Sequence, residues 1–172
     1  GWVVFAIAFL TYFSTIEPNL SFWDTGEYIS SAVKLEVTHA PGAALFQLVG
    51  SVAAMFAFGN GENYSVVINS MSALFSAFTI LFLFWTITHL VRRLLNKEFD
   101  EINKHQEISI LFAGVIGALC FTFSDTFWFS AVEGEVYSMT SMFIALLVWL
   151  ITKWENEYHD ADNERWIILI FF

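Results

Sequence analysis

Charge and cysteine are scarce in this sequence. Only 14% of the 172 residues are charged, and Lys and Arg together number seven, so no nucleic-acid partner is expected. The single cysteine, Cys120, excludes an intrachain disulfide and leaves the redox compartment open. Apolar residues are abundant: 57% of the chain is hydrophobic, with 20 Phe and seven Trp, and the mean hydropathy is +0.62. This composition predicts an integral membrane protein.

The two ends of the sequence lead us to expect a piece of a longer protein. It begins with Gly1 instead of Met, enters an apolar segment at once, and stops at Phe172 inside another. We therefore expect residues 1–172 to be the N-terminal portion of one transmembrane domain in a longer chain.

Long apolar runs predict an all-α fold, a polytopic transmembrane helical bundle. A helix rises ~1.5 Å per residue and the hydrocarbon core is ~30 Å thick, so about 20 apolar residues suffice to cross it. The candidate segments are 2–16, 41–58, 63–91, 108 to about 129 and 136–152, and a further one opens at 166–172. Residues 63–91 include no Asp, Glu, Lys or Arg.

The basic residues indicate a topology, because Lys and Arg tend to remain on the cytoplasmic side. Six of the seven lie in the loop that starts "VRRLLNK" and in the loop "KWENEYHDADNER", so both loops are expected inside. We expect 41–58 to be a re-entrant or surface-lying helix, because its many small residues suit protein contacts better than lipid. The loops around Asp24 and around 124–138 then share the external face.

The stretch "SFWDTGEYISSAVKLEVTHAPG", residues 21–42, holds the first polar motif. Asp24 followed by Glu27 fits a capping box at the start of a helix, and Glu27, Ser31 and Lys34 form the polar side of an external amphipathic helix. The functional alternative makes Asp24 a general base and Glu27 the group that orients a partner, both facing a cleft above the bilayer. Spacing alone leaves both interpretations open.

His39 lies in "THAPG", just before Pro41, and proline favours the first position of a helix. The histidine can cap that helix, bind substrate or face water. Because it has no Cys or His neighbour in the sequence, no metal site is predicted.

The second polar motif is "SDTFWFSAVEGEVYS", residues 124–138. Glu133 and Glu135 are expected where one helix leaves the membrane and the next enters it, among interfacial aromatic residues that include Tyr137. Acids at this depth are more often functional than acids on a soluble loop, while a plain surface turn is the alternative. Before this motif, the small residues Gly114 and Gly117 predict close helix packing.

Together, "FWDTGEYISSAVKLEVTHAPGA" and "FSDTFWFSAVEGEVYSM" resemble a bacterial and eukaryotic family of polytopic membrane proteins related to protein O-mannosyltransferases, in the GT-C glycosyltransferase superfamily. The family pattern has Trp-Asp-x-Gly-Glu in the first external loop, His-Pro-Pro-Gly after it, and Glu-Val-Tyr at the second external turn. The matching residues are Trp23, Asp24, Gly26, Glu27, His39, Pro41, Gly42, Glu135, Val136 and Tyr137. Ala40 replaces the first proline of the pattern.

The resemblance implies the N-terminal part of a GT-C-like fold and a membrane glycosyltransferase. Such an enzyme moves a sugar from a polyprenyl-phosphate donor to a protein hydroxyl on the external face, with inversion at the anomeric carbon. Asp24 and Glu27 are then the expected catalytic residues, with Asp24 as the base that takes the acceptor proton. The expected substrate-binding residues are Lys34, His39, Glu133, Glu135 and Tyr137.

The same resemblance implies the surroundings of the enzyme. No cofactor is expected, and the lipid-linked sugar is the donor substrate. The sequence itself shows no sign of a metal site, although acids near a pyrophosphate could hold a metal ion. The expected partners are membrane lipid, the polyprenyl-phosphate sugar and the acceptor protein. The expected location is the bacterial inner membrane, with the active side facing the periplasm.

Two other classes of function stay open at the level of sequence. In the first, the chain is a non-catalytic membrane subunit that contributes helix packing to a larger complex. In the second it is a transporter, in which acids face a cavity. A proton path needs ionisable groups near the bilayer centre, and residues 63–91 offer no acid or base of that kind.

Overall fold

The computed structural model describes residues 1–95, 102–156 and 164–171, which leaves Lys97 and the centres of both basic loops outside the described residues. Within those ranges the regular structure is helical and no strand forms, so the all-α prediction is confirmed. The helices are α1 (Trp2–Ser14), α2 (Thr25–Lys34), α3 (Ala44–Ala54), η1 (Met55–Ala57), η2 (Gly61–Asn63), α4 (Tyr64–Leu94), α5 (Lys104–Thr122), α6 (Asp125–Ala131), α7 (Val136–Asn156) and α8 (Glu164–Phe171).

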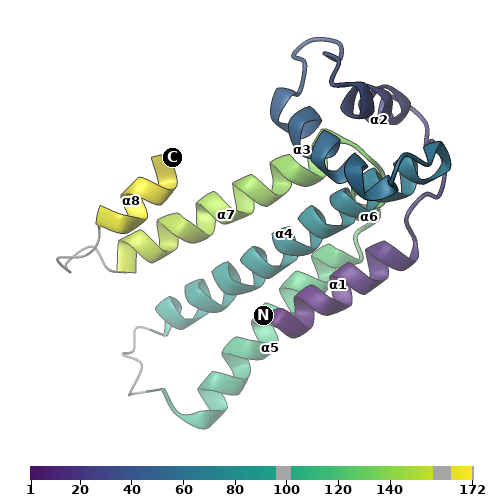
Figure 1. Ribbon diagram of the computed structural model, residues 1–172. Coiled ribbons are helices and arrows are strands. Elements are labelled where there is room, and N and C mark those ends of the chain that lie inside the picture. Colours follow the sequence, from purple (N-terminus) through teal and green to yellow (C-terminus); the bar gives the residue numbers. More distant parts are fainter. Residues whose placement is uncertain (96–101, 157–163, 172) are drawn as a thin grey trace.

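Helix α4 is the centre of the bundle, and α1, α5 and α7 pack around it (Figure 1). Among the described residues, three helical segments are long and apolar enough to cross a membrane: Gly61–Leu94, Lys104–Thr122 and Val136–Asn156. The core between α4 and its neighbours is built from buried apolar side chains: Val4, Ala8, Tyr12, Ala73, Ala77, Ile80, Phe84 and Ala118. These spans and this core make the chain an integral membrane protein.

The close packing predicted for the glycines of α5 is present where this helix meets α4. A Cβ added at Gly114 would lie 2.5 Å from a methyl carbon of Thr88, and one at Gly117 would lie 2.7 Å from Ile87. Because a real side chain cannot approach so closely, these two glycines let the helices come together.

The apolar run after residue 108 is divided, whereas the sequence suggested one helix to about residue 129. Helix α5 ends at Thr122, whose carbonyl oxygen accepts a hydrogen bond from the Tyr12 hydroxyl at 2.9 Å. Ser124 has an extended backbone and α6 begins at Asp125, so a new helix starts where Ser-Asp offers an N-terminal signal.

Helix α3 begins at Ala44 and not at Pro41, so the predicted helix start was wrong. Gly42 and Ala43 have φ angles of +88° and +40°, which lie outside the helical region. Ala44 to Ala57 spans about 20 Å at the usual helical rise, less than the hydrocarbon core. This length agrees with the prediction that 41–58 does not cross the membrane.

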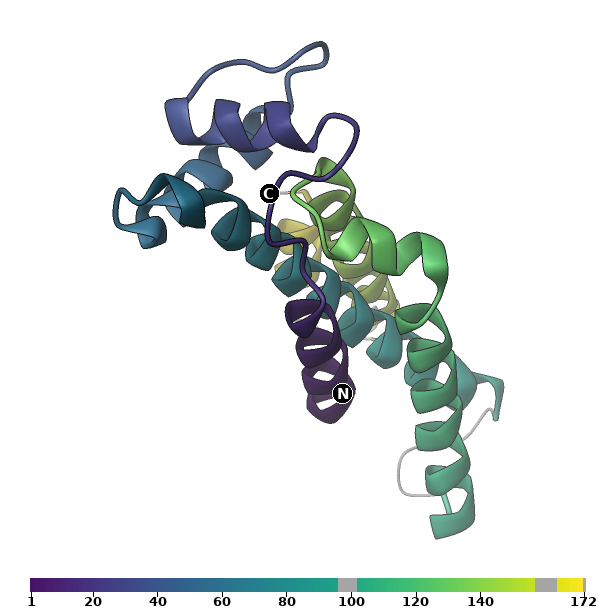
Figure 2. The same cartoon turned by 90° about the vertical axis from the view of Figure 1, so that its right-hand side faces the viewer.

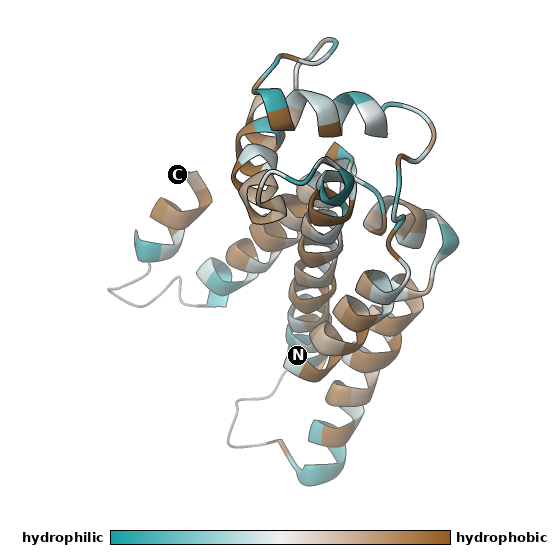
Figure 3. Cartoon of the chain, turned by 45° about the vertical axis from the view of Figure 1, so that its right-hand side comes forward, coloured by the Kyte–Doolittle hydropathy of each residue, from teal (hydrophilic) through white to brown (hydrophobic). Residues whose placement is uncertain are grey.

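The polar residues gather at the two ends of the bundle, while apolar residues cover its middle (Figure 3). At one end, Arg93 of α4 pairs with Glu155 of α7, which brings the two basic loops to the same end as predicted. At the other end lie α2, α3 and the α6–α7 connection (Figures 1 and 2). The two polar motifs of the sequence therefore meet at one end of the molecule.

Candidate active site

Helix α2 packs on the end of the bundle through one apolar face. Tyr28, Ile29 and Ala32 are buried in a cluster with Phe46 of α3 and Ile68 of α4. The Tyr28 and Phe46 rings meet edge to face, with centroids 5.6 Å apart. The amphipathic helix predicted from the sequence thus fixes the position of its N-terminus, where Asp24 stands.

The predicted capping box does not form at this N-terminus. Asp24 occupies the N-cap position, but its side chain makes no capping hydrogen bond, and Glu27 turns away toward the loop after α2. The Asp24 carboxylate is consequently 56% exposed at the end of the bundle. Of the two alternatives that spacing left open, the structure supports an accessible carboxylate at this position.

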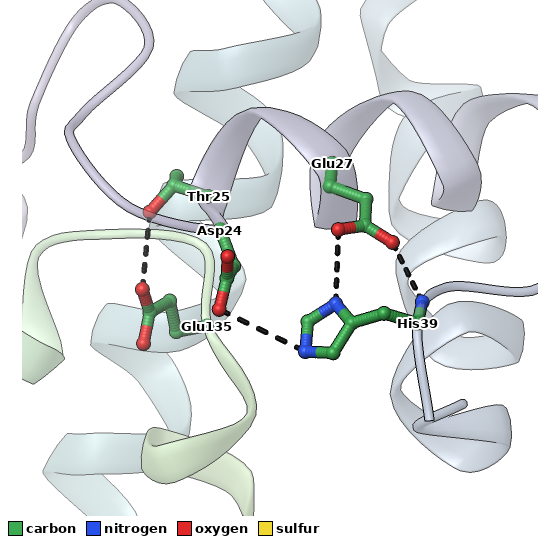
Figure 4. A network of polar contacts seen from close by, with 5 residues as sticks. All are labelled: Asp24, Thr25, Glu27, His39 and Glu135. Atoms are coloured by element: carbon green, nitrogen blue, oxygen red, sulfur yellow. Dashed lines mark hydrogen bonds and ion pairs between the residues drawn. The ribbon is translucent and has the colours of Figure 1, made fainter. Parts of the chain in front are cut away.

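Glu27 holds His39 by two hydrogen bonds. One carboxylate oxygen, Oε1, accepts from the His39 backbone N–H at 2.7 Å, and the other, Oε2, lies 2.9 Å from ring Nδ1 (Figure 4). The backbone hydrogen bond to His39 is the largest reason that the Glu27 pKa is lowered from its ordinary value. The hydrogen bond with Glu27 raises the pKa of His39, and the charge of Asp24 adds to this effect.

The other ring nitrogen of His39 faces Asp24. Nε2 lies 3.8 Å from Asp24 Oδ2, which is too long for a hydrogen bond. Asp24, Glu27 and His39 offer ligand atoms within 4.8 Å of one another, so these three could hold a divalent cation. The sequence predicted no metal site here, because the histidine is distant from other ligands along the chain. The expected absence of a metal stays a prediction.

Glu133 and Glu135 lie directly beneath the first turn of α2. Glu135 Oε1 accepts a hydrogen bond from the Thr25 hydroxyl at 3.5 Å, and Glu133 accepts one from Ser21. Only 3% of Glu133 and 7% of Glu135 is exposed. Burial raises the pKa of both carboxyl groups, and the charges of Glu133 and Asp24 raise that of Glu135 further.

The structure therefore brings together Asp24, Glu27, His39, Glu133 and Glu135 from the two predicted motifs. Lys34 stands at the far end of α2, about 15 Å along the helix from Asp24. Tyr137 is at the start of α7 and is 60% exposed. The roles assigned to all these residues, including substrate binding by Glu133, Glu135, Lys34 and Tyr137, stay predictions.

Three polar residues of this region were missed by the reasoning from sequence. Ser21 and Thr25 bind the two buried glutamates, and Asn69 of α4 donates from Nδ2 to the Glu17 carbonyl oxygen at 2.6 Å. Ser21 and Thr25 flank Asp24 in the first motif, so hydroxyls beside an acid were the available signal. Asn69 is a polar amide in the second turn of the long apolar helix α4, and this was the available signal there.

The comparison with known proteins finds a family match that includes the second polar motif and all of the first from Asp24 onward. Residues 24–172 match the family model described as the protein O-mannosyl-transferase TMEM260 N-terminal domain. No solved structure matches the chain.

Two curated relatives extend this likeness. The chain is 28% identical over 164 residues to the protein O-mannosyl-transferase tmem260 of Dictyostelium discoideum, which is 95% of this chain and 18% of that protein. It is 29% identical over 163 residues to TMEM260 of Mus musculus, which is 94% of this chain and 20% of the mouse protein. The chain thus spans about a fifth of the length of these relatives. Since the family model covers most of the residues, the chain belongs to the family of the protein O-mannosyl-transferase TMEM260 N-terminal domain.

Proposed function

We propose that the full-length protein is a membrane mannosyltransferase of GT-C type, which transfers mannose from a polyprenyl-phosphate donor to a Ser or Thr hydroxyl of a protein. The family, and the activity that the names of its relatives state, support the mannosyl transfer. The membrane spans support a lipid-linked donor, because its tail can stay in hydrocarbon while its head reaches the end of the bundle.

One observation carries the proposal: Asp24 presents an accessible carboxylate at the end of a membrane bundle, on a rigid and well-supported helix start. The side chain is half exposed, while α2 behind it is fixed by the buried cluster around Tyr28 and Ile29. The neighbouring Thr25 is held by Glu135 of the second motif. A general base needs this combination of access and fixed orientation.

In the proposed reaction Asp24 takes the proton of the acceptor hydroxyl as the hydroxyl oxygen attacks the anomeric carbon of the donor. The new C–O bond forms while the bond from that carbon to the phosphate oxygen breaks. The electron pair of the broken bond leaves with the polyprenyl phosphate, and attack from the opposite side inverts the anomeric carbon. The transfer itself uses no cofactor.

The charge around Asp24 sets a requirement for binding the donor. Asp24, Glu27, Glu133 and Glu135 are all acids, and the nearest basic side chain is His39, whose pKa is raised by Glu27. A donor phosphate needs positive charge nearby to offset these acids. We assign this role to basic groups from the remainder of the full-length chain, while His39 adds positive charge beside Asp24. Lys34 stands at the opposite end of α2 and could reach a phosphate only there.

We further propose that this end of the bundle is the external side, as the positions of the basic residues favour. In a bacterial host that side is the periplasmic face of the inner membrane. The acceptor protein then meets the site on the side opposite the basic loops.

The test is transfer by the full-length protein carrying Asp24→Asn. The purified protein receives polyprenyl-phosphate [3H]mannose and a Ser- and Thr-rich acceptor protein, and label on the acceptor is counted. Loss of a general base lowers turnover by about 10²–10⁴-fold. Glu36→Gln is the matched control, since it removes an exposed carboxylate just after the same helix and should keep full activity.

Three results would contradict the proposal. Unchanged transfer by Asp24→Asn would remove Asp24 from the reaction. No transfer by the wild-type protein, with normal amounts in the membrane, would favour the non-catalytic subunit of a larger complex. A solute flux in reconstituted vesicles that disappears with Glu27→Gln or Glu135→Gln would favour the transporter instead.

A further inference from the structure

The carboxylate of Glu27 has both of its oxygens engaged by one residue. Oε1 accepts the backbone N–H of His39 and Oε2 meets ring Nδ1, at 2.7 and 2.9 Å. Each of these lengths is that of a strong, charge-assisted hydrogen bond. Both oxygens of Glu27 are therefore turned toward His39, although Glu27 stands one helical turn from Asp24 on the same helix.

This double contact adds to the anchors of the loop after α2, which include the buried Thr38 and the backbone hydrogen bond from Glu36 to Ser31. Helix α2 ends at Leu35 in a left-handed conformation, with φ of +55°, and the chain then reverses toward α3. Leu35, Glu36, Val37 and His39 are exposed along this return. The Tyr28 ring lies 6.0 Å from the His39 ring, and Asp24 Oδ2 lies 3.8 Å from Nε2. Among these neighbours, Glu27 alone is hydrogen-bonded to the imidazole ring.

The contact with Glu27 fixes which ring nitrogen of His39 faces Asp24. With the backbone N–H and Nδ1 both tied to Glu27, the imidazole cannot turn over without losing a hydrogen bond. Nε2 is left facing Asp24 Oδ2 across 3.8 Å (Figure 4). An oxygen atom at hydrogen-bonding distance from both atoms fits this separation, since two contacts of about 2.8 Å close a triangle on a 3.8 Å base.

We propose that Glu27 is a positioning residue, which holds His39 so that ring Nε2 and Asp24 Oδ2 contact the same substrate oxygen. Glu27 acts only through His39 and does not touch the substrate. This inference rests on the proposed transferase function, and it assigns to Glu27 a role different from that of a catalytic acid or base. Residues that orient a functional histidine through its second nitrogen commonly contribute about 10–100-fold to the activity of a site.

The first test is a double-mutant cycle in the full-length protein, measured with polyprenyl-phosphate [3H]mannose and the acceptor protein. Glu27→Gln keeps the shape of the side chain, but an amide has one acceptor oxygen and cannot accept both N–H groups. We expect kcat to fall about 10–100-fold, with little change in KM for the donor. Glu27→Asp retains both acceptor oxygens and should recover part of the loss.

The decisive variant combines Glu27→Gln with His39→Ala. If Glu27 acts through His39, the double variant is no slower than His39→Ala alone, since the positioned group is already absent. A double variant slowed by the product of the two single effects would overturn the proposal, because Glu27 would then act by itself. Glu36→Gln is the matched control and should leave every parameter unchanged.

A second measurement tests the contact between Glu27 and His39 without a transfer assay. In the full-length protein labelled with ¹⁵N-histidine, the ring signals of His39 are identified by their loss in His39→Gln. Glu27→Gln should shift these signals and Glu36→Gln should not; unshifted signals in Glu27→Gln would overturn the proposal. This measurement distinguishes failure of the positioning role from failure of the proposed function. If Glu27→Gln shifts the His39 signals as expected but the wild-type protein transfers no mannose, only the proposed function is contradicted.

A metal ion would give a different pattern. Transfer that stops with a chelator and returns with Mn²⁺, together with Mn²⁺ binding that is weakened in each of Asp24→Asn, Glu27→Gln and His39→Gln, would identify these three residues as ligands of a cation. That outcome would also overturn the positioning role, since both oxygens of Glu27 could not then serve His39.

Discussion

The Thr25 hydroxyl and Glu135 Oε1 lie 3.5 Å apart although 110 residues separate them in the chain. Thr25 is the first residue of α2 and Glu135 immediately precedes α7, so the contact joins the two external segments of the bundle. A second hydrogen bond, from Ser21 to Glu133, joins the same two segments a few residues earlier in the chain. Because Asp24 stands between Ser21 and Thr25, its position is set by the second motif as well as by its own helix.

Thr25→Val should therefore destabilise this end of the protein. The substitution keeps the shape of a fully buried side chain but removes the hydroxyl that donates to a buried carboxyl group. We expect a loss of about 1 kcal/mol in the free energy of unfolding, measured as a lower thermal midpoint of the full-length protein in detergent.

Thr140→Val is the matched control for that substitution. Thr140 is exposed on α7 and its hydroxyl bonds only to the Val136 carbonyl oxygen of its own helix. An equal loss of stability in both variants would mean that the contact between Thr25 and Glu135 contributes nothing of its own.

The buried carboxyl groups predict a dependence of stability on pH. Burial raises the pKa of Glu135, so the folded protein keeps this proton at pH values where the unfolded chain has released it. Stability from this group is then fully present below the ordinary glutamate pKa and falls as pH rises through the raised pKa. Glu135→Gln stays neutral throughout and should lose less stability over the same range.

The measurement is the thermal midpoint of wild type and Glu135→Gln across mildly acidic to neutral pH. The difference should move in favour of the variant as pH rises. Glu36→Gln serves as the control, because an exposed carboxylate is not subject to this burial. Parallel curves for wild type and Glu135→Gln would contradict the raised pKa.

The membrane core was predictable because its signal is long and simple. The charge-free run at 63–91 corresponds to α4, since any long apolar segment must form a helix to satisfy its backbone in lipid. The break between α5 and α6 was missed because the apolar run continues through Phe121 and Phe123 without a charge. A helix start at Ser124-Asp125 is a local signal that hydropathy does not detect.

The candidate site was predictable in its location and not in its contacts. The basic loops place the two motifs at one end, and the structure does the same. The partnership of Glu27 with His39 was not predictable from spacing, because it depends on a left-handed turn at Leu35 that returns the chain over twelve residues. The local sequence favoured a capping box for Glu27, but in the structure Glu27 contacts His39 instead.

Gly134, between the two buried glutamates, should be the least replaceable residue of the α6–α7 connection. A Cβ at this position would lie 3.0 Å from Asn69 Oδ1 and from a methyl carbon of Ile68, and 3.3 Å from Ile29. These atoms belong to α4 and α2, whose packing leaves little room for movement. Gly134→Ala should cost about 1–3 kcal/mol and lower the thermal midpoint of the full-length protein.

The same variant should also slow transfer, because the connection carries Glu133 and Glu135 against Ser21 and Thr25 on either side of Asp24. Gly61→Ala is the matched control, since a Cβ there meets no atom within 4 Å. A Gly134→Ala protein with normal stability would show that α2 and α4 can separate by the few tenths of an ångström that the methyl group requires. Normal transfer by such a protein would then mean that the position of Asp24 tolerates this separation, and would weaken the case that the second motif sets it.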